Sequence, residues 1–430
     1  MSAQKALERT VDLVRTDVFP KASAAEVVAA LTGTRVRLRA DERELSSVEG
    51  QTVVATTAIV AAQSGVELVL DLADVPLLPD QPPLRGAGFD DAVLELTSDL
   101  ITPANRDDGG DVDLTINFGA TPSAGRPALR LAPVETGFEL TPHDRPRSRS
   151  WSESEAFAAM FGGVAAGAET FRTAMRTLAR NGHRPILAKA AREPLPMQLA
   201  VPRTTRTGDL GAIDVISAGA MTQGMLFALL RVPDISAQVR VFDDDLLDWP
   251  NLNRYPLARQ ALLEHPKAML LERYSTSAIE ISGIQARFDE HLAGLVKLQS
   301  LVAIGVDHIP SRWQAQAAAP GAVVVGATSH FEVVVSSHPA GEPCAGCFYQ
   351  DDGDDDRAIP TASFVSTFAG ILQACRLLSQ PSERPRAHLI RAAPLNLAGA
   401  RPMVELGVAR RTNCPAKCRE RVLGGTQDQT

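Results

Sequence analysis

The chain has 430 residues, of which 45% are hydrophobic and 22% are charged. This composition supplies enough apolar surface for folded cores, and the length predicts two domains, because a domain commonly holds about 150 residues. A net charge of -8 argues against nucleic acid as a partner, since that binding needs clustered lysines and arginines. The first 15 residues mix charges at helical spacing, and no stretch reaches about 18 uninterrupted apolar residues. We therefore expect a cytoplasmic protein with no membrane partner.

The first half alternates strand-like and helical patterns. Strand-like runs at residues 34–40, 66–74 and 112–119 accompany a helical pattern at 51–65, and a long helical run follows at 152–175. These elements predict an α/β domain over residues 1–195.

The first strand-to-helix turn of this half, residues 41–50, carries acidic side chains where a nucleotide-binding turn carries glycines. Acidic groups compete with a phosphate for the N–H groups and the dipole of a helix N-terminus. This half is therefore predicted not to bind nucleotide.

A proline-rich stretch at residues 193–211 marks the expected boundary, and a second domain is expected over residues 205–430. Strand-like runs at 212–218 and 238–244 flank a helical pattern at 221–232, which predicts a βαβ unit of a doubly wound parallel sheet. Apolar runs at 278–284, 300–307 and 321–337 extend that sheet. The first half looks like a second copy of this plan, although an unrelated α/β domain remains an alternative.

Polar residues follow the strands of the second half. The turn at residues 217–224 contains Gly219 and other small residues that let backbone N–H groups approach phosphates, although a purely structural turn would look the same. The second strand ends in acids, Asp243 and Asp245, which can accept hydrogen bonds from ribose hydroxyls. Donors and positive charges follow at Asn251, Arg254 and Lys267. A later strand ends at Asp307, at the sheet edge where such folds bind ligands, and its carboxylate suits Mg²⁺.

Residues 243–255, followed by Lys267, resemble the signature D-x-D-x-V-x-x-S-N-L-N-R-Q plus lysine. This signature belongs to the superfamily of the ThiF and MoeB sulfur-carrier adenylyltransferases and the ubiquitin-activating enzymes. The chain departs from it at Leu247, Pro250 and Tyr255.

The resemblance covers about residues 205–418. It implies two Rossmann-like adenylation-type domains arranged as a pseudo-dimer, an inactive one in front of an active one. The long helix at 152–175 would then pack between the halves, and either Arg9 or Arg15 would reach across to the nucleotide.

The same resemblance implies ATP and Mg²⁺ as cofactors. Asp243 would bind the ribose, and Asp307 would hold the magnesium ion. The phosphates would be bound by Asn251, Arg254 and Lys267.

Four of the five cysteines form two close pairs, Cys344 with Cys347 and Cys414 with Cys418. In a reducing compartment such pairs indicate metal ligation, and four thiolates complete a tetrahedral Zn²⁺ site. Many members of the superfamily carry such a structural zinc, although the second pair here holds one extra intervening residue. The fifth cysteine, Cys375, lies in an apolar helical pattern and is predicted to be a buried core thiol.

The acidic run at residues 351–356 lacks the ligand spacing of a calcium-binding EF-hand loop. We interpret this run as a solvated loop.

The predicted activity is adenylation of the C-terminal carboxylate of a ubiquitin-like protein, followed by transfer towards a conjugating enzyme. The first alternative is activation of a sulfur carrier in the manner of ThiF or MoeB. A fused inactive half favours conjugation, because those relatives work as homodimers. A Rossmann oxidoreductase would not explain Asn251, Arg254 or the cysteine pairs, and a non-catalytic scaffold would not need Lys267 and Asp307.

In ubiquitin-activating enzymes a catalytic cysteine follows the first zinc pair by about a dozen residues. Here Thr361 and Ser363 stand in that region, so hydroxyls replace the thiol. Either residue could form an oxyester with the activated carboxylate. Alternatively the segment begins a core helix, with Thr361 as its N-cap, and the reaction stops at the adenylate. Both interpretations remain open.

Overall fold

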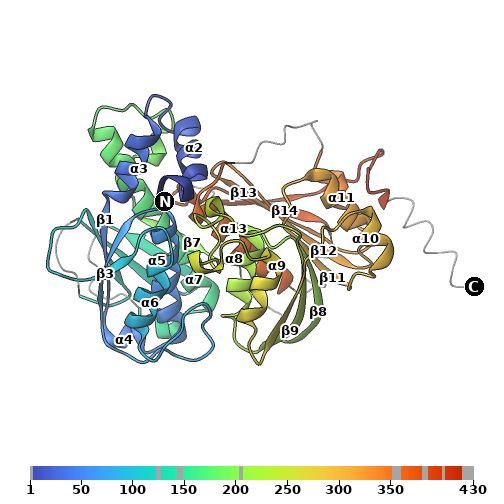
Figure 1. Ribbon diagram of the computed structural model, residues 1–430, viewed down its shortest axis with the longest axis horizontal. Helices are drawn as coiled ribbons and strands as arrows, with labels where there is room; N and C mark the ends of the chain where they lie inside the picture. The colour runs from blue at the N-terminus through green and yellow to red at the C-terminus, as the bar shows by residue number, and fades with distance from the viewer. Residues whose placement is uncertain are drawn as a thin grey trace, which may run out of the picture.

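The computed structural model places two α/β halves side by side, with helices between their sheets (Figure 1). The structure describes residues 3–122, 127–142, 149–202, 207–350, 360–379, 386–399 and 402–418. The acidic run at 351–356 therefore lies outside the described residues. Among the described residues, no helix is both long and apolar enough to span a bilayer.

The first half holds a seven-stranded sheet in the order β3-β2-β1-β4-β5-β6-β7. Pairing is parallel from β3 through β5, and β6 and β7 are added antiparallel. Its strands are β1 Arg35–Ala40, β2 Glu67–Leu72, β3 Ala104–Arg106, β4 Leu114–Phe118, β5 Ala128–Val134, β6 Gly137–Thr141 and β7 Met197–Ala200.

The second half holds an eight-stranded sheet in the order β10-β9-β8-β11-β12-β13-β14-β15. Pairing is parallel from β10 through β12 and antiparallel from there on. Its strands are β8 Gly208–Ile216, β9 Ile235–Phe242, β10 Ile279–Ile284, β11 Leu301–Ile304, β12 Ala322–Ser329, β13 Glu332–His338, β14 His388–Ala392 and β15 Met403–Gly407.

Helices accompany the sheet in each half. Those of the first half are α1 Ala3–Ala6, α2 Glu8–Asp17, α3 Ala24–Thr32, α4 Glu42–Leu45, α5 Val48–Gln63, α6 Phe89–Ser98 and α7 Ala156–Arg180. Those of the second half are α8 Ala220–Leu229, α9 Lys267–Leu270, α10 Glu290–Leu295, α11 Ile309–Ala318, α12 Ala345–Phe348 and α13 Ser363–Leu377. Short 3-10 turns complete the described elements at η1 Trp151–Glu153, η2 Ala188–Ala190, η3 Trp249–Asn251, η4 Gln260–Leu262, η5 Leu271–Tyr274 and η7 Pro394–Asn396.

The two sheets follow the same strand order and the same switch from parallel to antiparallel pairing. In each half one helix between the first two strands, α5 or α8, packs on a long helix later in the chain, α7 or α13. This repetition confirms the expected pair of Rossmann-like domains and disfavours an unrelated α/β domain in front.

Glycines let these helix pairs approach closely. A Cβ atom added to Gly163 of α7 would lie 2.6 Å from the Cβ of Thr56 on α5. One added to Gly370 of α13 would lie 2.6 Å from the Cα of Gly224 on α8. Because such contacts are too short for real carbon atoms, only glycine permits these crossings.

The halves share one hydrophobic core across their junction. The long helix α7 contacts α13 of the second half as well as α5 of its own. Ring centroids of Phe161 and Phe368 lie 4.7 Å apart, and those of Phe171 and Phe364 lie 5.2 Å apart. Aromatic pairs at this spacing add to the burial of apolar surface, so the junction is a packed interior.

The proline-rich stretch at 193–211 is not wholly a linker. Its middle forms β7, which pairs with β6, so the first sheet continues beyond residue 195.

Candidate active site

A polar cavity of about 260 Å³ lies where β8, β9 and β11 end. The predicted residues that line it are Gly219, Asp243, Asp245, Asn251, Arg254, Lys267, Asp307 and Thr361. Parallel strands of a doubly wound sheet bring their carboxyl ends to one edge, and ligands bind there. The fold thus gathers residues of the second half that are up to 142 positions apart, from Gly219 to Thr361.

The turn between β8 and α8 forms the cavity floor. Dinucleotide-binding folds often carry the motif G-x-G-x-x-G in this turn, and Ser217 stands at its first glycine. The backbone of Ser217 adopts a φ of 91°, a region that favours glycine. Its hydroxyl accepts a hydrogen bond from the Gly219 N–H at 3.0 Å. Gly219 is the N-cap of α8 and provides no side-chain cap, so the first turn of this helix presents N–H groups towards an anion.

Asp243 is held at the end of β9 by two backbone donors. Its carboxylate accepts hydrogen bonds from the Ala218 N–H at 2.7 Å and the Asp245 N–H at 3.0 Å. Burial raises the pKa of Asp243 above its ordinary value, and the Ala218 N–H and the Lys267 ammonium oppose that shift.

Lys267 donates to the Asp245 carboxylate at 2.7 Å. Burial alone would lower the pKa of this ammonium, but Tyr255, Asp245 and Asp243 around it raise the pKa above its usual value. The lysine therefore enters the cavity as a cation.

Arg254 projects from the loop after η3. Its guanidinium donates to the carbonyl of Pro250 and, at 2.7 Å, to the Asn253 side chain. Burial lowers its pKa, with Arg9 acting in the same direction and Asp307 opposing it. Arg254 therefore lies within the electrostatic reach of both of these charged residues.

Of the two N-terminal arginines predicted to reach across, Arg9 lines the cavity. Arg15 instead donates to the carbonyl of Ala22 at 3.2 Å, within its own half. Arg9 is in place because α2 docks on the loop of the second half, where the Asn253 amide donates to the Thr10 hydroxyl at 3.0 Å.

Three carboxylates fit a hard divalent cation at this edge. One oxygen from each of Asp243, Asp244 and Asp245 lies within 4.8 Å of the others. Asp307 lines both the main cavity and an adjoining one of about 220 Å³. Carboxylate oxygens are the ligands that Mg²⁺ prefers, so these residues suit the metal.

Some lining residues escaped sequence reasoning. They are Arg312, Thr328 and Ser366, together with Met221 and Gly305. Arg312 is buried on α11, five positions after Asp307, and donates to the Val306 carbonyl at 2.7 Å. Its closeness to Asp307 in the sequence was the one available signal.

The two predicted hydroxyls differ in position. Thr361 lines the cavity, and its Oγ1 lies 3.3 Å from the Oγ of Ser366. Ser363 is 1% exposed, donates to the Val60 carbonyl at 2.8 Å and lies 3.0 Å from the Ser64 hydroxyl. Because Ser363 faces the first half instead of the cavity, we retain only Thr361 as a candidate nucleophile.

The structure also corrects the alternative in which Thr361 caps a helix. Helix α13 begins at Ser363 and has Ala362 as its N-cap, with no side-chain cap bond. Thr361 lies one residue before that N-cap, so its hydroxyl belongs to the cavity wall. Cys375, by contrast, is fully buried in α13 as predicted, and burial raises the pKa of its thiol.

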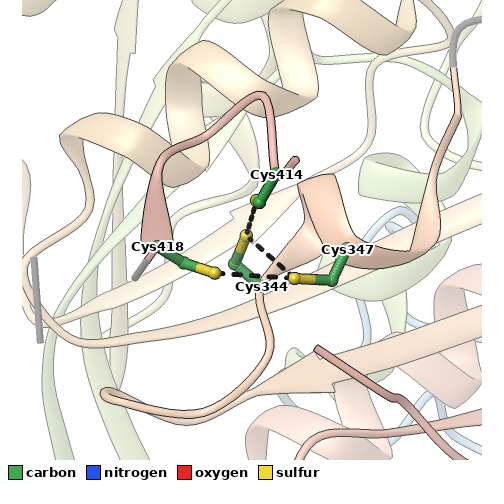
Figure 2. Close-up of side chains that lie close together, drawn as sticks. All are labelled: Cys344, Cys347, Cys414 and Cys418. Carbon is green, nitrogen blue, oxygen red and sulfur yellow. Dashed lines mark hydrogen bonds between the residues drawn. The ribbon is translucent and has the colours of Figure 1, made fainter. Parts of the chain in front are cut away.

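The four paired cysteines converge from two distant segments (Figure 2). The Sγ of Cys344 lies 4.0 Å from that of Cys347 and 3.2 Å from that of Cys414, and Cys347 Sγ lies 3.5 Å from Cys418 Sγ. Tetrahedral zinc with bonds of about 2.3 Å separates its sulfur ligands by about 3.8 Å. The four side chains therefore fit a closed structural Zn²⁺ site.

The extra residue of the second pair is accommodated by the backbone. Lys417 has a φ of 49°, and its N–H donates to the Cys414 carbonyl at 2.9 Å. This left-handed residue turns the chain so that Cys418 points back to the other sulfurs.

In the first half, the corresponding edge of the sheet is filled by the side chain of Glu44. Glu44 is fully buried beside Gly119, which follows β4 as Gly305 follows β11. Its carboxylate accepts hydrogen bonds from the N–H groups of Ala120 and Trp151, both at 2.9 Å, and from the Ser150 hydroxyl at 3.1 Å. The Glu44 carboxylate thus occupies this sheet edge and is held there by three donors.

The second half is thus a doubly wound α/β domain with a cavity of charged side chains at the sheet edge where such folds bind ligands. Residues 155–416, more than half of the chain, match the model of the ThiF family. The chain therefore belongs to the ThiF family, which confirms the resemblance drawn from residues 243–267. Residues 35–189 match a second model, the BilD N-terminal domain.

A curated relative, uncharacterized protein y4jF of Sinorhizobium fredii, is 26% identical to this chain over 348 residues. The matched region covers 76% of this chain and 62% of that relative. The chain thus spans less than two thirds of the relative's length.

Proposed function

We propose that this protein adenylates the C-terminal carboxylate of a ubiquitin-like protein. The observation that carries the proposal is the lining of one cavity, which combines four cationic side chains with two carboxylates. The cations are Arg9, Arg254, Lys267 and Arg312, and the carboxylates are Asp243 and Asp307. Such a set neutralises a polyphosphate while leaving carboxylates for a metal and a ribose. Membership of the ThiF family supports adenylyltransferase chemistry of this kind.

In the proposed reaction, the carboxylate attacks the α-phosphate of ATP, forming an acyl-adenylate and releasing pyrophosphate. Mg²⁺ would supply charge neutralisation at the phosphates and would be held by Asp307. Lys267 and Arg254 would stabilise the charge that develops on the phosphate oxygens, and Asp243 would orient the ribose. Positioning and preorganised charge supply most of the rate in reactions of this type.

A ubiquitin-like substrate is favoured over a sulfur carrier by the fused first half. That half contributes Arg9 to the cavity but fills its own sheet edge with Glu44. In this chain only the second half keeps an open cavity at its sheet edge, among the described residues. The homodimers of the sulfur-carrier branch are symmetric, so their two halves are the same. Transfer towards a conjugating enzyme is the next step of this proposal.

The test is ATP–pyrophosphate exchange by the purified chain, with and without a ubiquitin-like protein from the same genome. Exchange should require that protein. Arg254→Ala and Asp307→Ala should each lower exchange by at least about 100-fold, the scale of losing one preorganised charge contact. Arg43→Ala, an exposed arginine on α4, is the matched control and should leave exchange unchanged.

Wild-type exchange in both cavity variants would reject this site. Exchange with a sulfur carrier but not with the ubiquitin-like protein would instead select the sulfur-carrier alternative.

A further inference from the structure

A second cavity, of about 400 Å³, lies at the junction of the two halves, away from the candidate active site. One wall comes from the loop before α6 and from α6 itself, and the other comes from η4 and η5 of the second half. Its polar and charged lining residues are Arg85, Glu95, Ser98, Asp99, Arg259, Arg273 and Tyr274.

Arg259 is a buried arginine in the lining of this cavity. It is 8% exposed, and its Nη1 donates to the carbonyls of Pro256, at 3.2 Å, and Ala258. Its Nη2 is buried and has no hydrogen-bond partner among the described residues. A buried cation that lacks a counter-ion is costly, and an anion would offset that cost.

A second buried arginine adds to this cost. Arg231 is 3% exposed and donates to the carbonyls of Phe227, at 3.1 Å, and Gln81, at 3.4 Å. Burial lowers its pKa to about 9, and the charge of Arg259 acts in the same direction. Within the described part of the chain, neither arginine has a carboxylate within ion-pair distance.

Two exposed arginines, Arg85 and Arg273, also line the cavity and have no ion pair among the described residues. Two carboxylates line it as well. Asp99 attracts Arg259 from beyond ion-pair distance while its carboxylate accepts from the Ala261 N–H at 3.2 Å, and Glu95 is exposed. The cavity thus combines three arginines with two carboxylates.

The walls are tied together across the junction. The Gln260 N–H donates to the Asp99 carbonyl at 3.1 Å, and the Gln260 side chain donates to the Leu100 carbonyl at 2.5 Å. The cavity is therefore a formed feature between elements of both halves. Pre-formed polar groups that converge on a hollow are the usual architecture of a small-molecule site.

We propose that this cavity binds a phosphorylated small molecule, with its phosphate against Arg85, Arg259 and Arg273 and its hydroxyl groups facing Glu95 and Asp99. Arginine suits this task because its fork of donors matches phosphate oxygens. Carboxylates accept hydrogen bonds from hydroxyls, so the arginines and the two carboxylates select different groups of one ligand.

The proposal is tested by calorimetric titration of the full chain with glucose 6-phosphate, inorganic phosphate and glucose. Glucose 6-phosphate should bind, inorganic phosphate should bind more weakly, and glucose should not bind. Arg85→Gln and Arg273→Gln should each weaken glucose 6-phosphate binding by about tenfold or more, the scale of one lost charge-assisted contact. Both residues are exposed, so these variants should fold.

Two controls separate this cavity from the candidate active site. Lys267→Ala should leave glucose 6-phosphate binding unchanged, and so should Arg43→Gln at a distant exposed position. The proposal fails if both cavity variants bind as the wild type does, if Lys267→Ala abolishes binding, or if no phosphate-bearing probe binds at millimolar concentration. Equal affinity for phosphate and glucose 6-phosphate would overturn the role of Glu95 and Asp99.

Discussion

Nucleophilic side chains of this chain are unevenly placed around the candidate active site. All five cysteines lie among the described residues: four form the cluster of Figure 2, and Cys375 is fully buried. The hydroxyl of Thr361 reaches the cavity, whereas that of Ser363 does not. An activated carboxylate would therefore meet a hydroxyl on this chain before it met a thiol.

We expect no thiol-sensitive adduct between this chain and the ubiquitin-like protein. After incubation with ATP and that protein, samples are treated with dithiothreitol or with mild alkali and separated on a denaturing gel. Any adduct should resist thiol, yield to alkali, disappear in Thr361→Ala and persist in Ser363→Ala. An adduct that thiol cleaves and that Cys375→Ala removes would contradict this expectation.

Residues of the candidate site were predictable where they follow the ends of adjacent strands. Asp243 and Asp307 lie at one edge because β9 and β11 both flank β8 in a parallel sheet. Ser363 was wrongly predicted to lie in the site, because the sequence does not show at which residue α13 begins or which of its side chains face the cavity. Arg9 could not be separated from Arg15 until the docking of α2 was known, since both lie on that helix.

Among the elements, the cysteine cluster joins α12 to the segment after β15. The two cysteine pairs of the cluster are far apart in the chain, with 70 positions between Cys344 and Cys414. A metal that links them removes conformational freedom from the unfolded chain, and it must bind deprotonated thiols in the folded one.

Elemental analysis of the purified chain should find about one zinc ion per molecule. Cys344→Ser should lower both the zinc content and the free energy of unfolding, because three sulfurs leave a tetrahedral site incomplete. Cys375→Ala is the control: it removes a buried thiol from α13 and should keep the zinc. Zinc content that is unchanged in Cys344→Ser would reject the four-cysteine site.

The crossing of α8 and α13 makes a second prediction at this scale. An added Cβ at Gly370 would lie 2.6 Å from the Cα of Gly224 and would also press on the Met221 carbonyl. Because these neighbours are backbone atoms, the helices must separate, and Gly370→Ala should lower the free energy of unfolding by about 1–3 kcal/mol.

Urea denaturation measures this change, with Gly294→Ala as the matched control. Gly294 is also helical, but an added Cβ meets nothing within 4 Å. This control should leave stability unchanged or raise it by up to about 1 kcal/mol, since alanine is the better helix former. Equal effects of the two substitutions would show that the crossing tolerates separation.

Most strands of the second half could be predicted from their composition, because buried parallel strands are rich in valine and isoleucine. The weakest point was β7, whose residues lie in a proline-rich stretch that locally favours an irregular connection. Its pairing with β6 is a tertiary contact, and local sequence carries little information about it.

At the scale of the whole molecule, the two halves share an architecture but differ in what fills the sheet edge. The second half keeps an open cavity, while the first closes its own with Glu44 and contributes Arg9 to its neighbour. The repeated order of strands was foreseeable from the repeated pattern of elements. The donation of Arg9 was foreseen only through the resemblance, and the cavity at the junction was not foreseen at all, because its walls are far apart in the sequence.

The covalent joining of β7 to β8 has a consequence for how the cavity depends on protein concentration. In a pair of separate chains, a side chain lent by one partner is lost whenever dilution separates the two. Here α2 is tethered to the loop that it completes, so its effective concentration is set by the chain itself and not by the number of molecules in solution. Arg9 should therefore remain in place at dilutions that would dissociate a dimer of the same architecture, and each chain carries one such completed cavity in its described residues.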